Sequence, residues 1–469
     1  YSMNSHNDMP VEKMRAAGFS GSALAAFEHN YRFLCSGQQV EIAEDCIDPV
    51  SEVLSYDSLP EPEDSQIGQL LAKTVVLKLN GGLGTGMGLK QPKSMLRVRG
   101  DLTFLDVIAR QILALHERFD CRAAFKLMNS FSTSRESLDF LSRYPDLGKA
   151  EDLEIMQSRV PKIDAVSLSA ASYPAKPELE WCPPGHGDIF PALSGGGCLD
   201  WLLDQGITCA FISNCDNLGA TLDLKLLDAF LSSGMPLLME VAIRNEADRK
   251  GGHIARSKAT GRLVLRESGQ CPVEDIDSFQ DVRRHRFFNT NNIWIRLDVL
   301  KATLNSSGGV LPLPVIANRK TVNPRDPESA AVIQLETAMG AAIECFDNAG
   351  AILVPRARFA PVKNCSDLFA LRSDAYVMSA DSSVVLAPER KGKPPIIELD
   401  PKHYRYVEQV DRATENCMPS LLNCDRIRVS GPVCFQNATS FSGCVEIINT
   451  GGVERLLPAG SYKDQRISL

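Results

Sequence analysis

Leu79-Asn-Gly-Gly-Leu-Gly-Thr-Gly-Met-Gly-Leu-Lys-Gln-Pro-Lys93 is the stretch of sequence from which the fold can be worked out. It follows Thr74-Val-Val-Leu-Lys-Leu79, a β-branched and apolar run that is typical of a buried strand. Behind it, Thr103-Phe-Leu-Asp106 has the spacing of a helix capping box, and apolar residues recur at helical spacing from Phe104 to Leu115. The sequence therefore predicts a strand, a glycine loop and a helix in succession.

The glycine loop predicts a site for a phosphate group. It contains five glycines within eight residues: Gly81, Gly82, Gly84, Gly86 and Gly88. Repeated glycines expose bare backbone N–H groups, which bind anions, and Lys93 adds a mobile positive charge. Met87 stands where the last glycine of G-x-G-x-x-G belongs, and no glycine starts a Walker A pattern, so a dinucleotide dehydrogenase and a P-loop kinase are both excluded. The alternative is a flexible turn, but such turns rarely follow a buried strand and end in Pro-Lys.

Composition and charge narrow the class of protein. At 469 residues the chain exceeds what one core usually holds, so we expect two or three domains. The formal net charge of −8 argues against nucleic acid as a partner. No apolar run is long enough for a membrane span and the first residues lack a signal region, so we expect a cytoplasmic protein without a membrane partner. The 14 cysteines form no C-x-x-C pair, which argues against a zinc knuckle and favours reduced thiols.

Polar residues follow several apolar runs at the points where strands should end. Asn129 follows the run 123–128, and Asn214-Cys-Asp216 follows the run 210–213. Between about 66 and 375, short apolar runs alternate with amphipathic helices, which predicts a mostly parallel sheet covered on both faces. Ligands on such sheets bind at the carboxyl ends of the strands. Thr133-Ser-Arg-Glu136 is predicted to cap the helix after Asn129.

The chain divides into three predicted regions. Residues 1–65 are expected to form a helical N-terminal region and linker, 66–380 the sheet domain, and 381–469 a separate C-terminal domain. In the last region apolar residues recur every six positions in two ladders, which is the pattern of a short parallel β-helix. The ladders are Ile427, Val433, Thr439, Val445 and, two positions on, Val429, Phe435, Phe441, Ile447.

Six segments, in this order along the chain, resemble the eukaryotic-type UTP–glucose-1-phosphate uridylyltransferases, also called UDP-glucose pyrophosphorylases. They are the glycine loop, Met128–Phe131, Pro183–Asp188, Ser213–Ala220, Phe288–Trp294 and Arg358–Lys363. The resemblance implies an α/β, Rossmann-like nucleotidyltransferase domain with a mostly parallel sheet, followed by a C-terminal left-handed parallel β-helix. It also implies reversible formation of UDP-glucose and pyrophosphate from UTP and glucose 1-phosphate, with Mg²⁺ as cofactor.

By resemblance, the catalytic residues are Lys93, Lys363 and Asp216, with Asp216 holding the metal. In-line attack of the sugar phosphate on the α-phosphorus needs alignment and positive charge, so we expect no protein base. Because an apolar run precedes Lys363, we expect that lysine to be poorly hydrated. Asp216 could instead cap the following helix, around 222–231. Cys215 has no histidine motif to pair with and is interpreted as a packing residue.

Recognition of the two substrates is carried over from the family in the same way. Uracil requires donors and one acceptor, for which Gln157 is suited. The nucleotide contacts are Leu79, Asn80, Gly81, Gly82, Lys93, Met128, Gln157 and Gly185. The hydroxyls of glucose suit amides and a carboxylate, and His186 fits a hydrogen-bond donor better than a proton shuttle. The sugar-phosphate contacts are His186, Asn214, Gly251, Gly252, Glu267, Asn289, Asn291 and Lys363. The run 289–292 could instead be a turn with Asx hydrogen bonds.

Three hypotheses of function remain. The first is UDP-glucose pyrophosphorylase, and the second is a UDP-sugar pyrophosphorylase that also accepts galactose 1-phosphate. The third is an inactive sugar-nucleotide sensor, against which the joint presence of two lysines and an aspartate speaks. The oligomeric state stays open.

Overall fold

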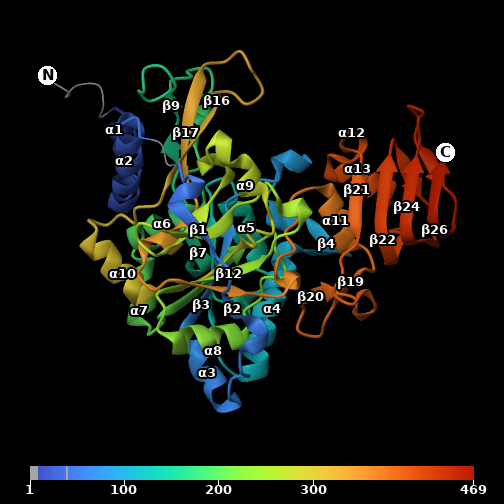
Figure 1. Ribbon diagram of the computed structural model, residues 1–469, viewed down its shortest axis with the longest axis horizontal. Helices are drawn as coiled ribbons and strands as arrows, with labels where there is room; N and C mark the ends of the chain where they lie inside the picture. Colours follow the sequence, from blue (N-terminus) through green and yellow to red (C-terminus); the bar gives the residue numbers. More distant parts are fainter. Residues whose placement is uncertain (1–8, 39–40) are drawn as a thin grey trace.

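The computed structural model describes residues 9–38 and 41–469. The parts of the predicted N-terminal region at 1–8 and 39–40 lie outside the described residues. Figure 1 shows a central sheet with helices around it, the N-terminal helices on one side and a separate group of C-terminal strands on the other. No helix among the described residues has the length and apolar character that crossing a membrane requires.

The central sheet is mostly parallel, as predicted. Its strands lie in the order β2-β18-β12-β15-β11-β3-β6-β7, and β15 is the one on this path that runs antiparallel to both its neighbours. Their bounds are β2 Leu54–Ser55, β18 Gly350–Leu353, β12 Leu237–Ile243, β15 Phe287–Arg296, β11 Cys209–Asn214, β3 Thr74–Asn80, β6 Ala124–Asn129 and β7 Glu154–Met156. The predicted strands before the glycine loop, before Asn129 and before Asp216 are therefore adjacent in the sheet.

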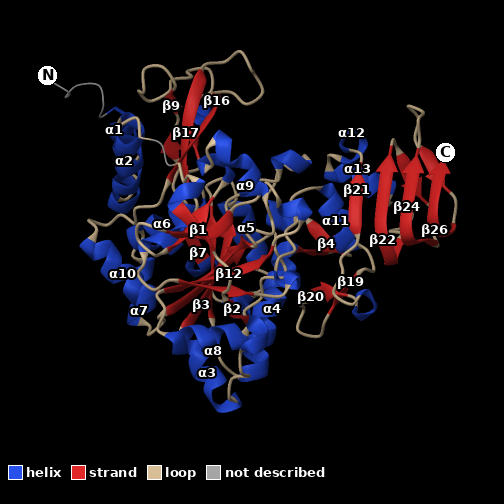
Figure 2. Cartoon of the chain, viewed as in Figure 1, coloured by secondary structure: helices blue, strands red, loops and turns tan. Residues whose placement is uncertain are grey.

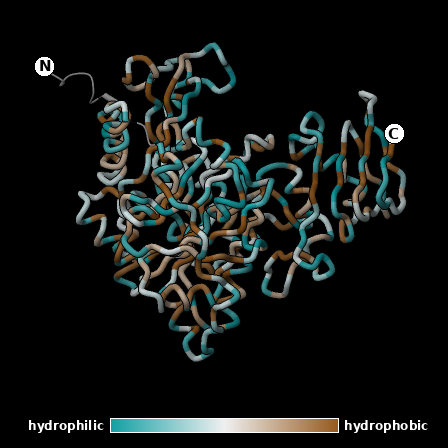
Figure 3. The backbone as a smooth tube through the Cα atoms, in the orientation of Figure 1, coloured by the Kyte–Doolittle hydropathy of each residue, from teal (hydrophilic) through white to brown (hydrophobic). Residues whose placement is uncertain are grey.

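Helices cover both faces of this sheet (Figure 2). In β3, Val76 packs into one core, whereas Val75 and Leu77 pack into the other. This alternation buries every residue of the strand, as its apolar run predicts. Figure 3 shows the hydrophobic segments gathered in the central strands and the helices beside them. The helices are α3 Asp64–Ala72, α4 Phe104–Phe119, α5 Ser134–Leu141, α6 Ile189–Gly195, α7 Cys198–Asp204, α8 Leu224–Ser233, α9 Ile276–Gln280 and α10 Leu297–Ser306.

Two predicted helix caps have different outcomes. Thr103 and Asp106 form a capping box at the start of α4: Asp106 N donates to Thr103 Oγ1 at 3.1 Å and Thr103 N to Asp106 Oδ2 at 2.8 Å. Thr133 occupies the predicted N-cap position directly before α5, but its side chain makes no cap hydrogen bond to that helix. Its hydroxyl instead accepts from Ser130 N at 3.0 Å. The local turn thus takes the oxygen that the helix would have used.

Smaller elements extend the sheet toward the N-terminal helices α1 (Met9–Ala16) and α2 (Gly21–Cys35). Strand β1 (Ile47–Pro49) pairs antiparallel with β13 (His253–Ser257), which pairs with β14 (Leu263–Arg266). A three-stranded sheet lies near α2, in the order β16-β17-β9. The remaining bounds here are β4 Arg97–Arg99, β5 Leu102–Thr103, β8 Val160–Pro161, β9 Ile163–Asp164, β10 Trp181–Cys182, β16 Val315–Thr321 and β17 Ala331–Thr337.

From β21 onward the C-terminal strands form two stacks in which every pair is parallel, whereas β19 and β20 pair antiparallel before them. One stack has the order β21-β22-β24-β26 and the other pairs β23 with β25. Ile427 lies opposite Val445 and Val429 opposite Ile447, and all eight residues of the two ladders are buried. The bounds are α11 Cys365–Arg372, β19 Tyr376–Met378, β20 Val384–Leu386, β21 Ile396–Leu399, α12 Pro401–Tyr404, α13 Val407–Ala413, β22 Ser420–Ser430, β23 Val433–Phe435, β24 Thr439–Ile448, β25 Arg455–Leu457 and β26 Gly460–Ser468.

Candidate active site

A cleft with about 1110 Å³ of free space opens at the carboxyl ends of β3, β6 and β11. Its position agrees with the rule for ligand sites in open parallel sheets. The predicted site residues that line it are Leu79, Asn80, Gly81, Gly82, Lys93, Met128, Gln157, Gly185, His186, Asn214, Asp216 and Lys363. Residues from distant parts of the chain thus meet where the strand ends converge.

The glycine loop turns back so that both its ends lie at this cleft. Lys93 N donates to Gly82 O at 3.2 Å, and Leu83 forms an isolated antiparallel bridge with Pro92. At the strand end, Asn80 donates to Asn129 Oδ1 at 2.7 Å and to Ser137 Oγ at 2.8 Å. The side chain of Asn80 therefore fixes β3 to its neighbours.

Lys93 and Asp216 form an ion pair inside the cleft. Lys93 Nζ donates to Asp216 Oδ2 at 2.7 Å, and each side chain is 20% exposed. The other oxygen, Asp216 Oδ1, is buried and has no hydrogen-bond partner among the described residues. The helix-cap alternative for Asp216 is wrong, because Asp223 caps α8 by accepting from Leu226 N at 3.0 Å. Asp216 therefore has a carboxylate oxygen available to a ligand.

Lys363 also lines the cleft, although it is far from Lys93 in the sequence. Val362 N donates to Asp216 O at 3.0 Å, which places Lys363 next to the loop that carries Asp216. The lysine is exposed, so the expectation of poor hydration is wrong. Its Nζ lies 5.7 Å from the centre of the Phe359 ring, and its charge opposes the rise that burial causes in the pKa of Glu267.

Gln157 lies between Gly81 and Gly185, on the side of the cleft that is predicted to bind uracil. Its Nε2 donates to Gly185 O at 3.0 Å, and a side-chain carbon added at Gly81 would lie 2.4 Å from Gln157 Oε1. Gly185 has a φ of 80°, and a side-chain carbon there would lie 2.4 Å from Thr337 O. Larger residues at either glycine would displace the glutamine or the loop.

His186 has a defined hydrogen-bonding role. Its Nδ1 accepts from Met339 N at 2.9 Å, so the proton of the neutral ring must sit on Nε2. Burial lowers the pKa of His186 to about 4, and the ring is neutral at physiological pH. This geometry supports the predicted donor and not a proton shuttle. Beside Asp216, burial raises the pKa of Cys215 to about 12, which fits packing rather than nucleophilic catalysis.

The asparagines predicted to contact glucose are joined in one chain of hydrogen bonds. Asn291 Nδ2 donates to Asn214 Oδ1 at 3.0 Å, and Asn291 N donates to Asn289 Oδ1 at 2.8 Å. The second is an Asx hydrogen bond, but it lies within β15 in the central sheet, so the surface-turn alternative is wrong. Asn291 has a φ of 62° beside a register irregularity between β12 and β15. Its Oδ1 is buried without a partner among the described residues.

Glu267 lies further along the same side. It lines, together with His186, a second pocket that is open to solvent. A side-chain carbon at Gly252 would lie 2.4 Å from Glu267 Oε2, so the carboxylate packs directly on this glycine. Gly251 O accepts from Arg244 Nη2 at 3.3 Å. The predicted sugar contacts thus extend from Asn214 to the turn before β13.

The comparisons with known proteins agree with one another. The model of the UTP–glucose-1-phosphate uridylyltransferase family matches residues 24–441. A barley (Hordeum vulgare) protein of that name is 39% identical over 425 residues, 89% of this chain and 87% of the relative. The chain belongs to the UTP–glucose-1-phosphate uridylyltransferase family.

Solved structures that are similar to this chain include proteins from two further organisms. UDP-glucose pyrophosphorylase from Leishmania major, known in open and closed structures, is 43% identical with a TM-score of 0.93, and the match covers 100% of both chains. UDP-glucose phosphorylase from Trypanosoma brucei is 46% identical with a TM-score of 0.89, and the match covers 98% of this chain and 99% of that one. Four mutants of the L. major enzyme were solved in complex with UDP-glucose.

The site fits the metal that nucleotidyltransferases of this kind use. Among the described residues no group of three or more His, Cys, Asp and Glu side chains could hold a metal. A hard divalent cation can be held by one carboxylate and the oxygens of the substrate phosphates. Asp216 would supply that carboxylate, since its buried Oδ1 has no hydrogen-bond partner among the described residues.

Two features of this uridylyltransferase site were missed in the sequence. Ser94 lines the cleft beside Lys93, and its hydroxyl is buried without a partner among the described residues. Its place directly after Lys93 was a usable signal. Beneath the cleft, Arg358 forms a two-point ion pair with the fully buried Glu240, with both N···O distances 2.7 Å. Glu240 lies in a strand with no motif, so no local signal predicted this pair.

Proposed function

We propose that this protein forms UDP-glucose and pyrophosphate, reversibly, from UTP and glucose 1-phosphate. One observation carries the proposal: Lys93, Asp216 and Lys363 converge with the glycine loop on a single cleft in a chain of the uridylyltransferase family. Binding alone would need fewer charged groups. The arrangement therefore favours catalysis over an inactive sensor.

The reaction is a direct transfer at phosphorus. A phosphate oxygen of glucose 1-phosphate forms a bond to the α-phosphorus of UTP, and the bond from that phosphorus to the bridging oxygen of pyrophosphate breaks. Lys93 holds the triphosphate and Lys363 meets the charge that develops at the α-phosphate, while the backbone N–H groups of the glycine loop bind phosphate oxygens. Mg²⁺ bound by Asp216 would neutralise phosphate charge. The sugar phosphate is ionised near neutral pH, so no protein base is needed.

The nucleotide half of the cleft reads uracil. Gln157 offers both an amide donor and an acceptor, and Gly81, Gly82 and Gly185 let the base approach the backbone. Leu79, Asn80 and Met128 shape the floor, because they come from the buried ends of β3 and β6. The held position of Gln157 between two glycines supports this role.

The sugar phosphate occupies the other half. His186 donates through Nε2 to its phosphate, since the Met339 backbone holds the ring in that tautomer. The glucose hydroxyls, each donor and acceptor, contact amides and a carboxylate. These groups come from Asn214, Gly251, Gly252, Glu267, Asn289 and Asn291. The unpartnered Oδ1 of Asn291 is one acceptor already in place for a hydroxyl.

The test is pyrophosphate release from UTP and glucose 1-phosphate with Mg²⁺. Activity is expected for the wild type and near-complete loss for Asp216→Asn, which keeps shape but removes the charge that holds the metal. Wild-type protein that binds UDP-glucose without releasing pyrophosphate would establish the sensor. Parallel rates with galactose 1-phosphate decide between the narrow and the broad enzyme, since the two sugars differ by one hydroxyl.

The proposal also covers the division of the chain into regions and the location of the protein in the cell. We propose the three regions 1–65, 66–380 and 381–469, the last being a left-handed parallel β-helix. The parallel pairing of β22, β24 and β26 and the buried ladders support the β-helix. The cytoplasm is the proposed location, which fractionation of the source cells would test.

A further inference from the structure

The segment of residues 41–53, which leads into β2, lies on the proposed sugar side of the site. Its strand β1 adds to β13, with Ile47 opposite Ser257 and Pro49 opposite Ala255. Near the start of this segment, Ile42 N donates to Gln270 O at 2.7 Å. The segment therefore forms an outer edge of the β13–β14 hairpin, beside the turn that begins at Glu267.

Glu44 of this segment brings a carboxylate among three cationic or titratable side chains. It accepts from Arg266 Nη1 at 2.6 Å, from Arg284 Nε at 2.5 Å and from His285 Nε2 at 3.0 Å. Arg266 is fully buried, and its other nitrogen donates to Asp275 Oδ2 at 3.2 Å. The same Asp275 oxygen accepts from Glu44 N at 2.6 Å. A buried guanidinium is thus balanced by two carboxylates, one of them from the N-terminal segment.

This ion-pair cluster lies one residue away from two proposed sugar contacts. Arg266 directly precedes Glu267, and His253 directly follows Gly252. Arg266 and His253 are opposite one another in the β13–β14 pairing, and the ring of His253 stacks on His285 with centroids 3.8 Å apart. Because Glu267 packs on Gly252 at contact distance, any shift of Arg266 is passed to both residues.

We infer that Glu44 is a positioning residue for the glucose 1-phosphate half of the site. Without the Glu44 carboxylate, Arg266 keeps only Asp275 as a counter-charge. The guanidinium must then regain hydration, and this moves the end of β14. A misplacement of about 1 Å at substrate contacts can cost about a hundredfold in rate. In the part of the chain that the structure describes, the proposed nucleotide contacts Gln157 and Lys93 form no hydrogen bond or ion pair with this cluster; β3, β6 and their loops hold them. The inference rests on the proposed function.

The test is Glu44→Gln, which keeps the shape of the side chain and removes its charge. KM for glucose 1-phosphate is expected to rise about tenfold or more, on the scale expected for displaced contacts, with KM for UTP nearly unchanged. The preference for glucose over galactose 1-phosphate is expected to fall as well. A loss of fold alone would lower the active fraction and leave both KM values as they were.

The matched control is Lys13→Met in α1, which removes a different ionic tie of the N-terminal region. Lys13 pairs with Glu180 and donates to Ala171 O at 3.1 Å, away from the β13–β14 hairpin. Neither KM is expected to change. If Glu44→Gln does not fold, Glu44→Asp keeps the charge on a shorter arm and is expected to give a smaller split in the same direction.

Three outcomes would overturn the inference. They are an equal rise in both KM values, unchanged KM values in a folded Glu44→Gln protein, and the same split in the Lys13→Met control. Glu267→Gln separates this failure from failure of the proposed site. If Glu267→Gln raises KM for glucose 1-phosphate and the Glu44 variants do not, the inference alone fails. If Glu267→Gln has no effect on that KM, the sugar contacts are wrong and the inference falls with them.

Discussion

Two lysines that are far apart in the sequence, Lys93 and Lys363, line the cleft, and the environments of their ammonium groups differ. Lys93 is already paired with the carboxylate at 2.7 Å, whereas Lys363 is exposed at the mouth of the cleft. Lys93 is therefore held before substrate arrives. Lys363 is hydrated, and it can give up that hydration when charge develops on the phosphate.

Replacement of Lys363 by Ala tests this division. Turnover is expected to fall by about 10²–10³-fold, the usual cost of removing one group that stabilises transition-state charge. KM for UTP is expected to change by a few-fold at most, because Lys93 and the glycine loop remain. Steady-state kinetics with each substrate varied would measure both effects. Equal losses in kcat and in UTP affinity would contradict the assigned role.

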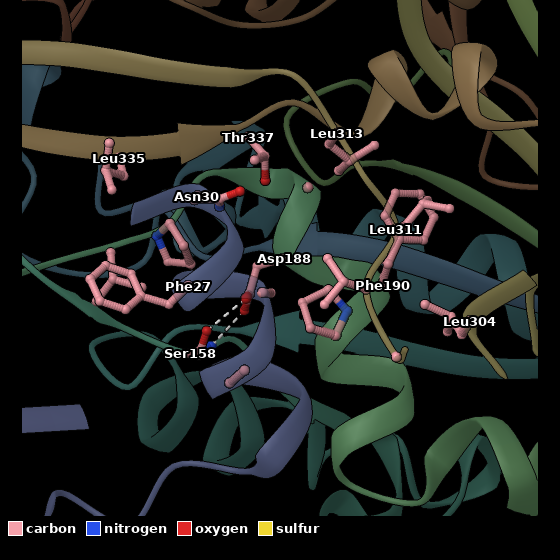
Figure 4. Close-up of a pocket in the computed structure, with 18 residues that line it drawn as sticks. Phe27, Asn30, Ser158, Asp188, Phe190, Leu304, Leu311, Leu313, Leu335 and Thr337 are labelled. Atoms are coloured by element: carbon pink, nitrogen blue, oxygen red, sulfur yellow. Dashed lines mark hydrogen bonds between the residues drawn. The ribbon is translucent and has the colours of Figure 1, made fainter. Parts of the chain in front are cut away.

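Asp188 lies two residues after His186, and its carboxyl group is buried. Figure 4 shows it facing Ser158, whose N and Oγ donate to its two oxygens at 2.7 and 2.6 Å. Burial raises the pKa of Asp188 to about 7 despite these bonds. Ser158 follows Gln157, so this group also anchors the proposed uracil contact.

The raised pKa makes stability depend on pH in a defined direction. In the unfolded chain an aspartate titrates near ~3.9, so the folded state holds the proton more tightly. The stabilising contribution is complete below about pH 4 and is lost as the pH rises to about 7. Asp188→Asn cannot titrate and is expected to lack this slope. Urea midpoints of both proteins at pH 5 and pH 8 would measure it, and equal slopes in the two proteins would show that Asp188 does not titrate in this range.

At the scale of the elements, the Glu240–Arg358 pair connects three parts of the molecule around the cleft. Trp294 Nε1 and Asn292 Nδ2 in β15 donate to Glu240 at 2.9 and 3.0 Å. Arg358 O accepts from Asn217 Nδ2 at 3.0 Å, next to Asp216. The strand β15, the loop that carries Asp216 and the segment leading to Lys363 are thus joined beneath the cleft.

Arg358→Met is expected to destabilise the protein by about 3–5 kcal/mol, because it leaves the carboxylate of Glu240 buried without its partner. Adding Glu240→Gln to this variant removes the charge and is expected to restore part of the loss. Denaturant unfolding of the wild type, both single variants and the double variant forms a complete cycle. Additive effects in this cycle would mean that the two side chains do not act as a pair.

The same elements explain what could be predicted from the sequence. The glycine loop, the Thr103 capping box and the six-residue ladders depend on residues close together in the chain, and a local pattern suffices for them. Thr133 lies at the predicted N-cap position but makes no cap bond, because its hydroxyl accepts from Ser130 N in the preceding turn. Arg358 and Glu44 depend on partners more than 100 residues away, which no local pattern reveals. The hydration of Lys363 was misjudged for the same reason, since exposure depends on how the chain packs.

At the scale of the whole molecule, the predicted boundary at residue 380 crosses a continuous core. One cluster of buried apolar residues runs from Phe104 and Ile108 in α4 to Phe435 and Phe441 near the C-terminus. The rings of Phe369 in α11 and Phe435 in β23 have centroids 5.7 Å apart. The C-terminal region also contacts the glycine loop, because a side-chain carbon at Gly88 would lie 2.9 Å from the Tyr406 ring.

This continuity leads to a prediction about the protein cut at residue 380. A fragment of residues 1–380 would expose the apolar face of α11 and lose the support of Tyr406 behind the glycine loop, so it is expected not to fold cooperatively. Domains joined by a large apolar interface unfold together. The full-length protein should therefore show one thermal transition by circular dichroism, and the fragment none. A fragment with its own sharp transition and retained UTP binding would mean that the shared core contributes little, and that the C-terminal strands are an independent unit.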